Sequence, residues 1–358
     1  MRLPILLCVV LLIVLPTFAQ PIDERCGSLA ADDCTLLLES EQSMADLNAA
    51  AFDVTLTIDI NPMLLNIPII TELVIIGDYV LNEKFNEIPD NPVQLITNWI
   101  TGITSDANII LTLPTQLNNL GFDVPEEPIT LDLRMVDGFG YANLVKILDS
   151  PEPTAWYGID LITYYNEIFD LLGLSATSPL ALPEEDAGVF GTVVSLGGDF
   201  TRLDDDANMV IIEGRVDGDQ ILADEDVREQ FELGLYLGLQ QQFGFYSDEE
   251  LQEAANLYAE FVRFFEARTT RMIDPATGYQ QQVITEIIFT PDPDIADTLN
   301  TATDPIGAAV LLEFAATITL DVRFDAFNAV APAQTPETYE LIPLDDLLPG
   351  GLNPGSGV

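Results

Sequence analysis

The sequence predicts an α+β fold: a large curved antiparallel β-sheet, or half-barrel, with helices packed on its concave face. Three observations lead to this prediction. Long stretches alternate apolar and polar residues, hairpin turns join several of them, and amphipathic helical stretches fall between them. In the longest stretch, 314–326, every even position is apolar. At ~3.4 Å per residue this strand spans roughly 44 Å, so it needs a large sheet beside it.

The N-terminal part is expected to form one helix and two strands. Asp32 or Asp33 can cap a helix that ends near residue 49. In residues 52–60, apolar residues alternate with Asp and Thr, which is typical of a strand with one buried face. The run at 69–80 is also strand-like, but it is apolar on both sides in part, so its register stays open.

The later elements show the same two patterns. Asp137-Gly138 is a typical hairpin turn between strands at 129–135 and 141–144. Ser247 and Glu250 form a capping box at the start of a helix. The other predicted elements are a helix at 93–103, strands at 107–113 and 156–161, a helix to about 172, strands at 189–203 and 208–216, a helical pair within 224–267, and a hairpin of 268–273 and 279–289.

We expect one domain over residues 20–343, preceded by a signal peptide at 1–19 and followed by a flexible Gly- and Pro-rich tail at 344–358. The first residues carry one base, an apolar run and then a small-residue cleavage site; a first transmembrane helix is the alternative. Residues 175–186 have the composition of a linker, but pairing of the first and last long strands would join both chain ends in one domain. The mature protein is therefore expected to be secreted or extracytoplasmic, with no membrane span.

Two cysteines follow the predicted cleavage site. Cys26 and Cys34 are close in sequence, and in an exported protein such a pair is expected to form a disulfide, with two free thiols as the alternative. Lipid attachment at Cys26 is not expected, because Asp23-Glu24-Arg25 is unlike the small, apolar approach of a lipobox.

The charge is strongly negative, at −47, with 59 acids and 12 bases. Such a field repels nucleic acid and anionic membrane surfaces, so neither is an expected partner. With 48% hydrophobic residues the chain can still fill a core. The acids are therefore expected mainly on exposed faces.

The sequence carries no signature of a known catalytic or metal site. It has no histidine, which excludes Ser-His-Asp and Cys-His catalysis and nearly all catalytic zinc sites, and it has no phosphate-binding loop motif. The acidic runs near Asp204 and Asp217 do not fit the calcium loop of an EF-hand, since Met209 stands where its glycine belongs. We expect no enzyme, no cofactor and no metal; catalysis by a carboxylate pair is the remaining enzymatic alternative.

Several of these segments together resemble the LolA/LppX/LprG-like bacterial envelope proteins. The helix ending in Ser43-Met44-Ala45-Asp46-Leu47 leads into strand 52–60; the strand and turn at 131–141 precede Trp156-Tyr157-Gly158-Ile159-Asp160-Leu161; and the 274–278 hairpin and the 320–328 strand complete the set. The resemblance implies a curved half-barrel with helices over its concave face and a lipid or an acylated molecule between them. The chain is longer than the family norm, and 224–267 is the expected insertion.

The function we expect is that of a secreted, non-enzymatic binder or carrier of a hydrophobic ligand in an apolar cavity between sheet and helices. The alternative is a structural or protein-interaction module of the cell envelope, with a filled core and an acidic surface. The residues expected to line the cavity are Leu56, Ile58, Trp99, Leu133, Trp156, Ile318, Leu320 and Phe324.

Overall fold

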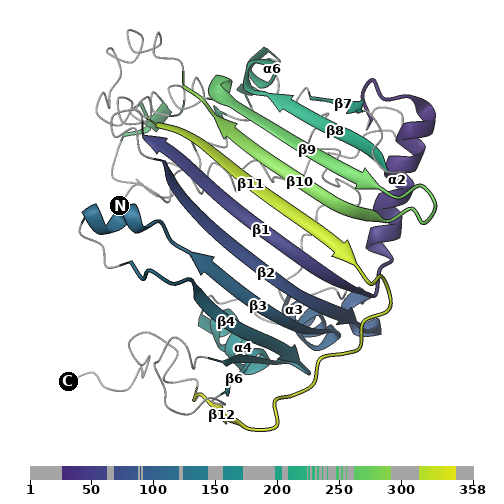
Figure 1. Cartoon of the computed structure of the whole chain (residues 1–358), viewed down its shortest axis with the longest axis vertical. Coiled ribbons are helices and arrows are strands. Elements are labelled where there is room, and N and C mark those ends of the chain that lie inside the picture. Colours follow the sequence, from purple (N-terminus) through teal and green to yellow (C-terminus); the bar gives the residue numbers. More distant parts are fainter. Residues whose placement is uncertain are drawn as a thin grey trace. The chain divides into compact units, whose positions relative to one another are not determined.

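The computed structural model describes residues 26–62, 68–87, 89, 92–120, 124–143, 156–171, 198–203, 209–223, 262–291 and 314–343, with scattered positions between 225 and 255. Twelve strands form one open sheet in the order β12-β6-β5-β4-β3-β2-β1-β11-β10-β9-β8-β7 (Figure 1). β12 pairs with β6 in parallel, and the other pairings of known register are antiparallel. The predicted α+β class, with a large and mostly antiparallel sheet, is confirmed.

The described elements are as follows. The strands are β1 (Ala49–Pro62), β2 (Ile69–Leu81), β3 (Ile103–Thr112), β4 (Ile129–Val136), β5 (Phe139–Asn143), β6 (Trp156–Asp160), β7 (Asp199–Arg202), β8 (Val210–Asp217), β9 (Phe265–Ile273), β10 (Gln280–Phe289), β11 (Phe314–Asp325) and β12 (Tyr339–Leu341). The α-helices are α2 (Ala31–Ala45), α3 (Pro92–Gly102), α4 (Leu161–Leu171) and α6 (Gly218–Ala223), and the short 3-10 helices are η2 (Glu83–Asn86), η3 (Thr115–Leu120) and η4 (Val262–Phe264).

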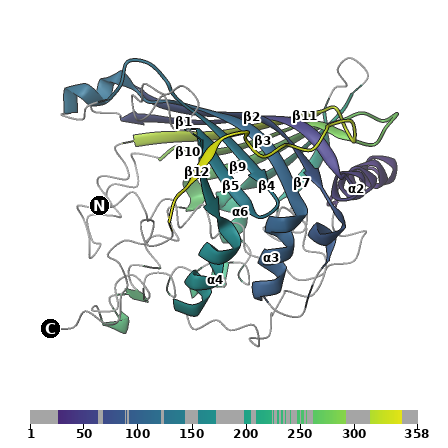
Figure 2. The same ribbon diagram turned by 90° about the horizontal axis from the view of Figure 1, so that it is seen from below.

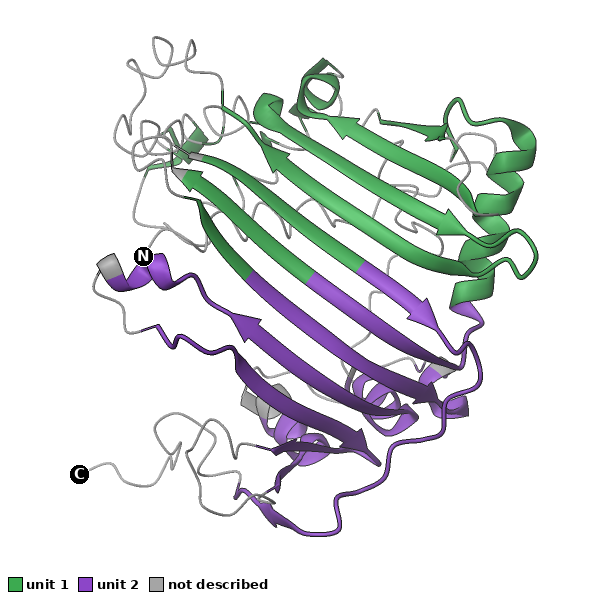
Figure 3. Cartoon of the chain, in the orientation of Figure 1, with its two compact units in different colours: residues 1–44, 56–71, 183–321 green, residues 45–55, 72–182, 322–358 purple. Residues whose placement is uncertain are grey.

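The chain divides into two compact units (Figure 3). Unit 1 comprises residues 1–44, 56–71 and 183–321, and unit 2 comprises 45–55, 72–182 and 322–358. Both draw on β1, β2 and β11, because each of these long strands contributes residues to both. The single domain over 20–343 stays a prediction.

Unit 1 has its core where β7, β8 and β9 meet α2 and α6. Alternate residues of β8, among them Ile212 and Val216, are buried, while Arg215 between them is exposed. Ile212 belongs to one apolar cluster with Leu37 of α2 and Phe200 of β7. Ile211 is buried as well, so the burial along β8 does not alternate strictly. The buried side chains stabilise the unit, because each fully buried aliphatic side chain contributes about 1.5–3 kcal/mol.

The N-terminal loop of unit 1 is held to the edge strand β7. Cys26 and Cys34 form the predicted disulfide, with their Cα atoms 5.7 Å apart. Ser28 donates its backbone N–H (2.7 Å) and its hydroxyl to the Asp199 carboxylate, and Arg202 pairs with Asp33. Burial alone would raise the pKa of Asp199. The hydrogen bonds that its carboxylate accepts from Ser28 and from the Phe200 N–H outweigh the burial and lower the pKa.

Unit 2 has α3 and α4 on one side of its strands, in contact with each other (Figure 2). Asp137 and Gly138, with φ of 51° and 87°, form the predicted turn between β4 and β5, in the left-handed conformation that such two-residue turns require. Gly140 on β5 faces Leu161 of α4, since a Cβ there would lie 3.3 Å from that side chain. The helix therefore packs directly on the sheet.

Several predicted boundaries were wrong. α2 ends at Ala45, because the chain is already extended from Ala49. α6 begins at Gly218, where a turn was expected, and β9 begins at Phe265, which was assigned to the second helix of the predicted pair. A Cβ on Gly218 would lie 1.7 Å from the Val262 carbonyl, so α6 and η4 approach closely enough to need glycine.

Other predictions lie outside the described residues or were not made. The signal peptide, the linker at 175–186, most of the helical pair within 224–267, and the tail at 344–358 lie outside. The short β12 was not predicted, because three residues carry no measurable periodicity.

Candidate apolar binding site

Unit 2 contains an apolar pocket of about 310 Å³ between η2, α3 and the ends of β3 and β4. Its lining is Phe85, Trp99, Ile100, Ile103 and Met135. Every one of these side chains is apolar, so the pocket offers dispersion and hydrophobic contact but no charged or hydroxyl group.

Asn82 holds η2 against the end of α3. Its side-chain oxygen accepts from the Lys84 N–H at 2.9 Å, and its side-chain nitrogen donates to the Thr101 carbonyl at 3.0 Å. Gly102 lets the two segments meet, because a Cβ there would lie 2.5 Å from the Phe85 nitrogen. The wall formed by Phe85 is therefore fixed by backbone geometry.

Trp99 is the most exposed lining residue among those quantified. Its side chain is 44% exposed, whereas Ile100 beside it is buried at 8%. The Trp99 and Phe85 rings lie 6.4 Å apart at 32°. A large aromatic side chain that lines an apolar pocket and is partly exposed to solvent has hydrophobic surface available for a ligand.

The apolar lining continues along the same face of the sheet. Met135 lies opposite Ser105 in register, and Ser105 lies opposite Tyr79. Two residues along β4, Leu133 pairs with Ala107, and the next pair on this face is Leu131 with Ile109. These positions are half-buried rather than sealed, so this face of β2, β3 and β4 extends the pocket wall as an apolar surface.

A second hollow lies next to this pocket. It is an open depression of about 620 Å³ lined by Asn48, Leu81, Asn82, Glu83 and Lys84. Leu81 of this depression and Ile103 of the apolar pocket are directly opposite in the β2–β3 register. One lining residue of the depression and one of the apolar pocket therefore form a cross-strand pair.

The eight residues predicted to line the cavity lie in different parts of the structure. Trp99 lines the pocket, and Leu133 lies on the same sheet face as Met135. Trp156 lies on the opposite face, where the Arg134 guanidinium is 4.8 Å from its ring centroid. Of the other five, Phe324 of β11 belongs to unit 2, and Leu56 and Ile58 of β1 and Ile318 and Leu320 of β11 belong to unit 1.

The prediction missed Phe85, Ile100, Ile103, Met135 and Lys84. Met135 has a sequence signal, since it continues the alternation of Leu131 and Leu133. Ile103 was placed on the apolar stripe of the predicted helix, but it is the first residue of β3. Phe85 is in a four-residue 3-10 helix, which has no periodic signature.

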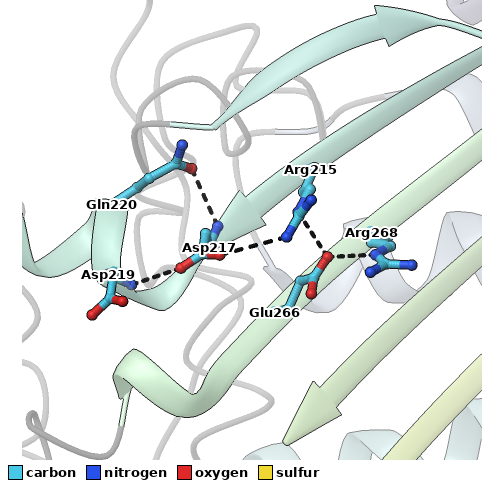
Figure 4. Close-up of polar contacts among 6 residues, drawn as sticks. All are labelled: Arg215, Asp217, Asp219, Gln220, Glu266 and Arg268. Carbon is cyan, nitrogen blue, oxygen red and sulfur yellow. Dashed lines mark hydrogen bonds and ion pairs between the residues drawn. The ribbon is translucent and has the colours of Figure 1, made fainter.

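The acidic segment at 217–219 forms hydrogen bonds and an ion pair with neighbouring residues (Figure 4). Asp217 accepts from the Asp219 N–H at 2.9 Å and lies 3.6 Å from Arg215. Glu266 accepts from Arg268 and Arg215, and the hydrogen bond from Arg268 is the main reason that the pKa of Glu266 is lowered. This cluster on β8 and β9 is a partly exposed ion network, which salt weakens.

Across the described ranges, no group of three or more Cys, Asp or Glu side chains is arranged to hold a metal ion. No helix among them is long and apolar enough to cross a membrane. A scan against protein-family models finds no family that matches this chain, and a search of curated proteins finds no match.

Proposed function

We propose that this protein is a secreted, non-enzymatic binder or carrier of a hydrophobic ligand such as a lipid or an acylated molecule. The observation that carries the proposal is the pocket of about 310 Å³ whose described lining residues are all apolar, with Trp99 among them 44% exposed. The volume is at the low end of the ~300–1,000 Å³ range of small-molecule sites. The resemblance to LolA/LppX/LprG-like envelope proteins supports the same ligand class and a place in the cell envelope.

The two tryptophans give a direct test, because they lie on opposite faces of the sheet in unit 2. Native mass spectrometry of the purified protein should first show whether a lipid co-purifies, and extraction should then empty the site. In the Trp156→Phe variant only Trp99 emits. Titration with a fatty acid brominated along its chain should quench this emission in a saturable manner, because heavy-atom quenching requires contact.

The Trp99→Phe variant is the matched control. Its remaining fluorophore, Trp156, is covered by Arg134 and should not be quenched saturably. If neither variant is quenched and no lipid co-purifies, the binding function is wrong. The protein-interaction module with a filled core then becomes the better description.

A further inference from the structure

We propose that the ligand is an amphiphile with an anionic head group, whose chain occupies the apolar pocket and whose head group lies at Lys84. This inference rests on the proposed function and specifies its ligand class. It is based on three features: the adjacency of residues that line the two hollows, the scarcity of positive charge in the chain, and the absence of an acidic partner for Lys84 among the described residues.

The first feature is that neighbouring residues line the two hollows. Lys84 lines the open depression and Phe85 lines the apolar pocket, and the two residues are consecutive in η2. On the sheet side, Leu81 and Ile103 make the same transition as register partners. A single molecule with an apolar chain and a polar end matches this arrangement, whereas a purely apolar ligand would leave the depression empty.

The second feature is the scarcity of positive charge. The chain has 12 bases against 59 acids, so a cation beside an apolar pocket is unusual on composition alone. Five arginines are paired with carboxylates: Arg134, Arg202, Arg215, Arg228 and Arg268. Within the residues whose placement is described, by contrast, no carboxylate forms an ion pair with Lys84. Its ammonium is available to an incoming anion.

The neighbouring polar groups do not compete for that role. The Asn82 amide is used by η2 and Thr101, and the Asn48 amide donates to the Asp46 carbonyl at 3.3 Å. Among the described lining residues of the depression, Glu83 is the one acid, and it opposes an anionic ligand. Lys84 is thus the lining group that can attract a carboxylate or a phosphate, and removing the Glu83 charge should strengthen that attraction.

The test compares three ligands with the same chain: decanoate, decyl phosphate and 1-decanol. Binding is read from Trp99 emission in the Trp156→Phe background at about 0.15 M ionic strength, which screens the long-range repulsion between the negatively charged protein and an anionic ligand. The anionic ligands should bind about fivefold more tightly than decanol, as expected for an exposed ion pair. Lys84→Met should remove this preference, Lys84→Arg should retain it, and Glu83→Gln should increase it. The ratio of decanoate to decyl phosphate affinity identifies the preferred head group.

The outcomes separate this inference from the proposed function. If all three ligands bind equally and Lys84→Met changes nothing, the anionic head group is wrong and hydrophobic binding stands. If Lys84→Met weakens the binding of decanol as much as the binding of decanoate, Lys84 acts through its alkyl chain and the inference is also wrong. If no ligand binds to the wild-type pocket, the proposed function itself fails.

Discussion

The Arg134 guanidinium lies over the Trp156 ring at 4.8 Å and also donates to the Asp106 carboxylate at 2.8 Å. One side chain thus links β3, β4 and β6 on the sheet face opposite the apolar pocket. A planar guanidinium can stack and donate at once, whereas a lysine ammonium cannot reproduce both contacts.

Arg134→Lys should therefore lower the free energy of unfolding by about 0.5–1 kcal/mol, the usual strength of an exposed cation–π contact. Urea unfolding followed by circular dichroism measures the change. Binding of decanoate should stay at the wild-type value, because the substitution is on the other face. An equal loss after Arg228→Lys, at an exposed pair outside this stack, would contradict the assignment.

Arg271 is buried at 3% exposure on β9, and this burial lowers its pKa to about 10, while Glu41 of α2 opposes the shift. Burying the guanidinium charge is costly, so Arg271→Met should be neutral or should stabilise the protein by about 1 kcal/mol. Glu41→Gln should instead destabilise it, because it removes a carboxylate charge that favours the buried guanidinium.

Thermal and urea unfolding of the two variants give the comparison. If both substitutions destabilise the protein equally, the interactions of the Arg271 guanidinium contribute more free energy than its burial costs. That result would contradict the prediction for Arg271→Met.

Asp78 and Asp106 lie directly opposite each other in the β2–β3 register. Burial, and then the charge of Asp106, raise the pKa of Asp78. Because the folded pKa exceeds the unfolded value, the folded protein binds this proton more tightly. The pair therefore opposes folding at neutral pH, and the penalty is relieved as the pH falls through the folded pKa.

Asp78→Asn should raise the free energy of unfolding by about 0.5 kcal/mol at pH 7, and the gain should shrink as the pH falls and vanish below about pH 3, where the carboxyl is protonated in both states. Urea unfolding of the variant and the wild type between about pH 3 and pH 7 measures this difference. A gain that is independent of pH would show that packing, and not charge, is responsible. Asp132→Asn is the control, because no carboxylate lies opposite Asp132 in the β3–β4 register.

The Cys26–Cys34 disulfide closes a short loop next to β7. Its replacement by two serines should lower the free energy of unfolding by about 2.5 kcal/mol, mainly through the added entropy of the unfolded chain. Urea unfolding with and without a reducing agent tests this, and the serine variant should not respond to the reductant. A wild-type protein that is equally insensitive would contradict the prediction.

The strands were largely predictable because apolar and polar residues alternate along most of the long strands. The alternation in 52–60 and 129–135 and the Asp137-Gly138 turn are local signals, and they match β1, β4 and the β4–β5 connection. The disulfide was predictable for a similar reason, since it depends on spacing and compartment. The α3–β3 boundary was not, because it depends on the close approach of Gly102 to Phe85.

The site was predictable only in part, because its residues come from four elements. Trp99 was identified from its size and apolar setting, but Trp156 has the same character and lies on the other face. The face of a residue in β6 depends on its register with β5, where Trp156 pairs with Asn143. Sequence periodicity over a five-residue strand does not determine this register.

The sheet ends in two very short strands, with three residues in β12 and four in β7. Each edge therefore offers few backbone groups to a neighbouring molecule, and at β7 Ser28 and Asp33 already occupy the side chains of Asp199 and Arg202. Edge-to-edge stacking of copies into fibrils is thus disfavoured. The described part of this β-rich chain thus offers only short edge strands for pairing between copies, a restriction that does not depend on charge and so is not weakened by salt.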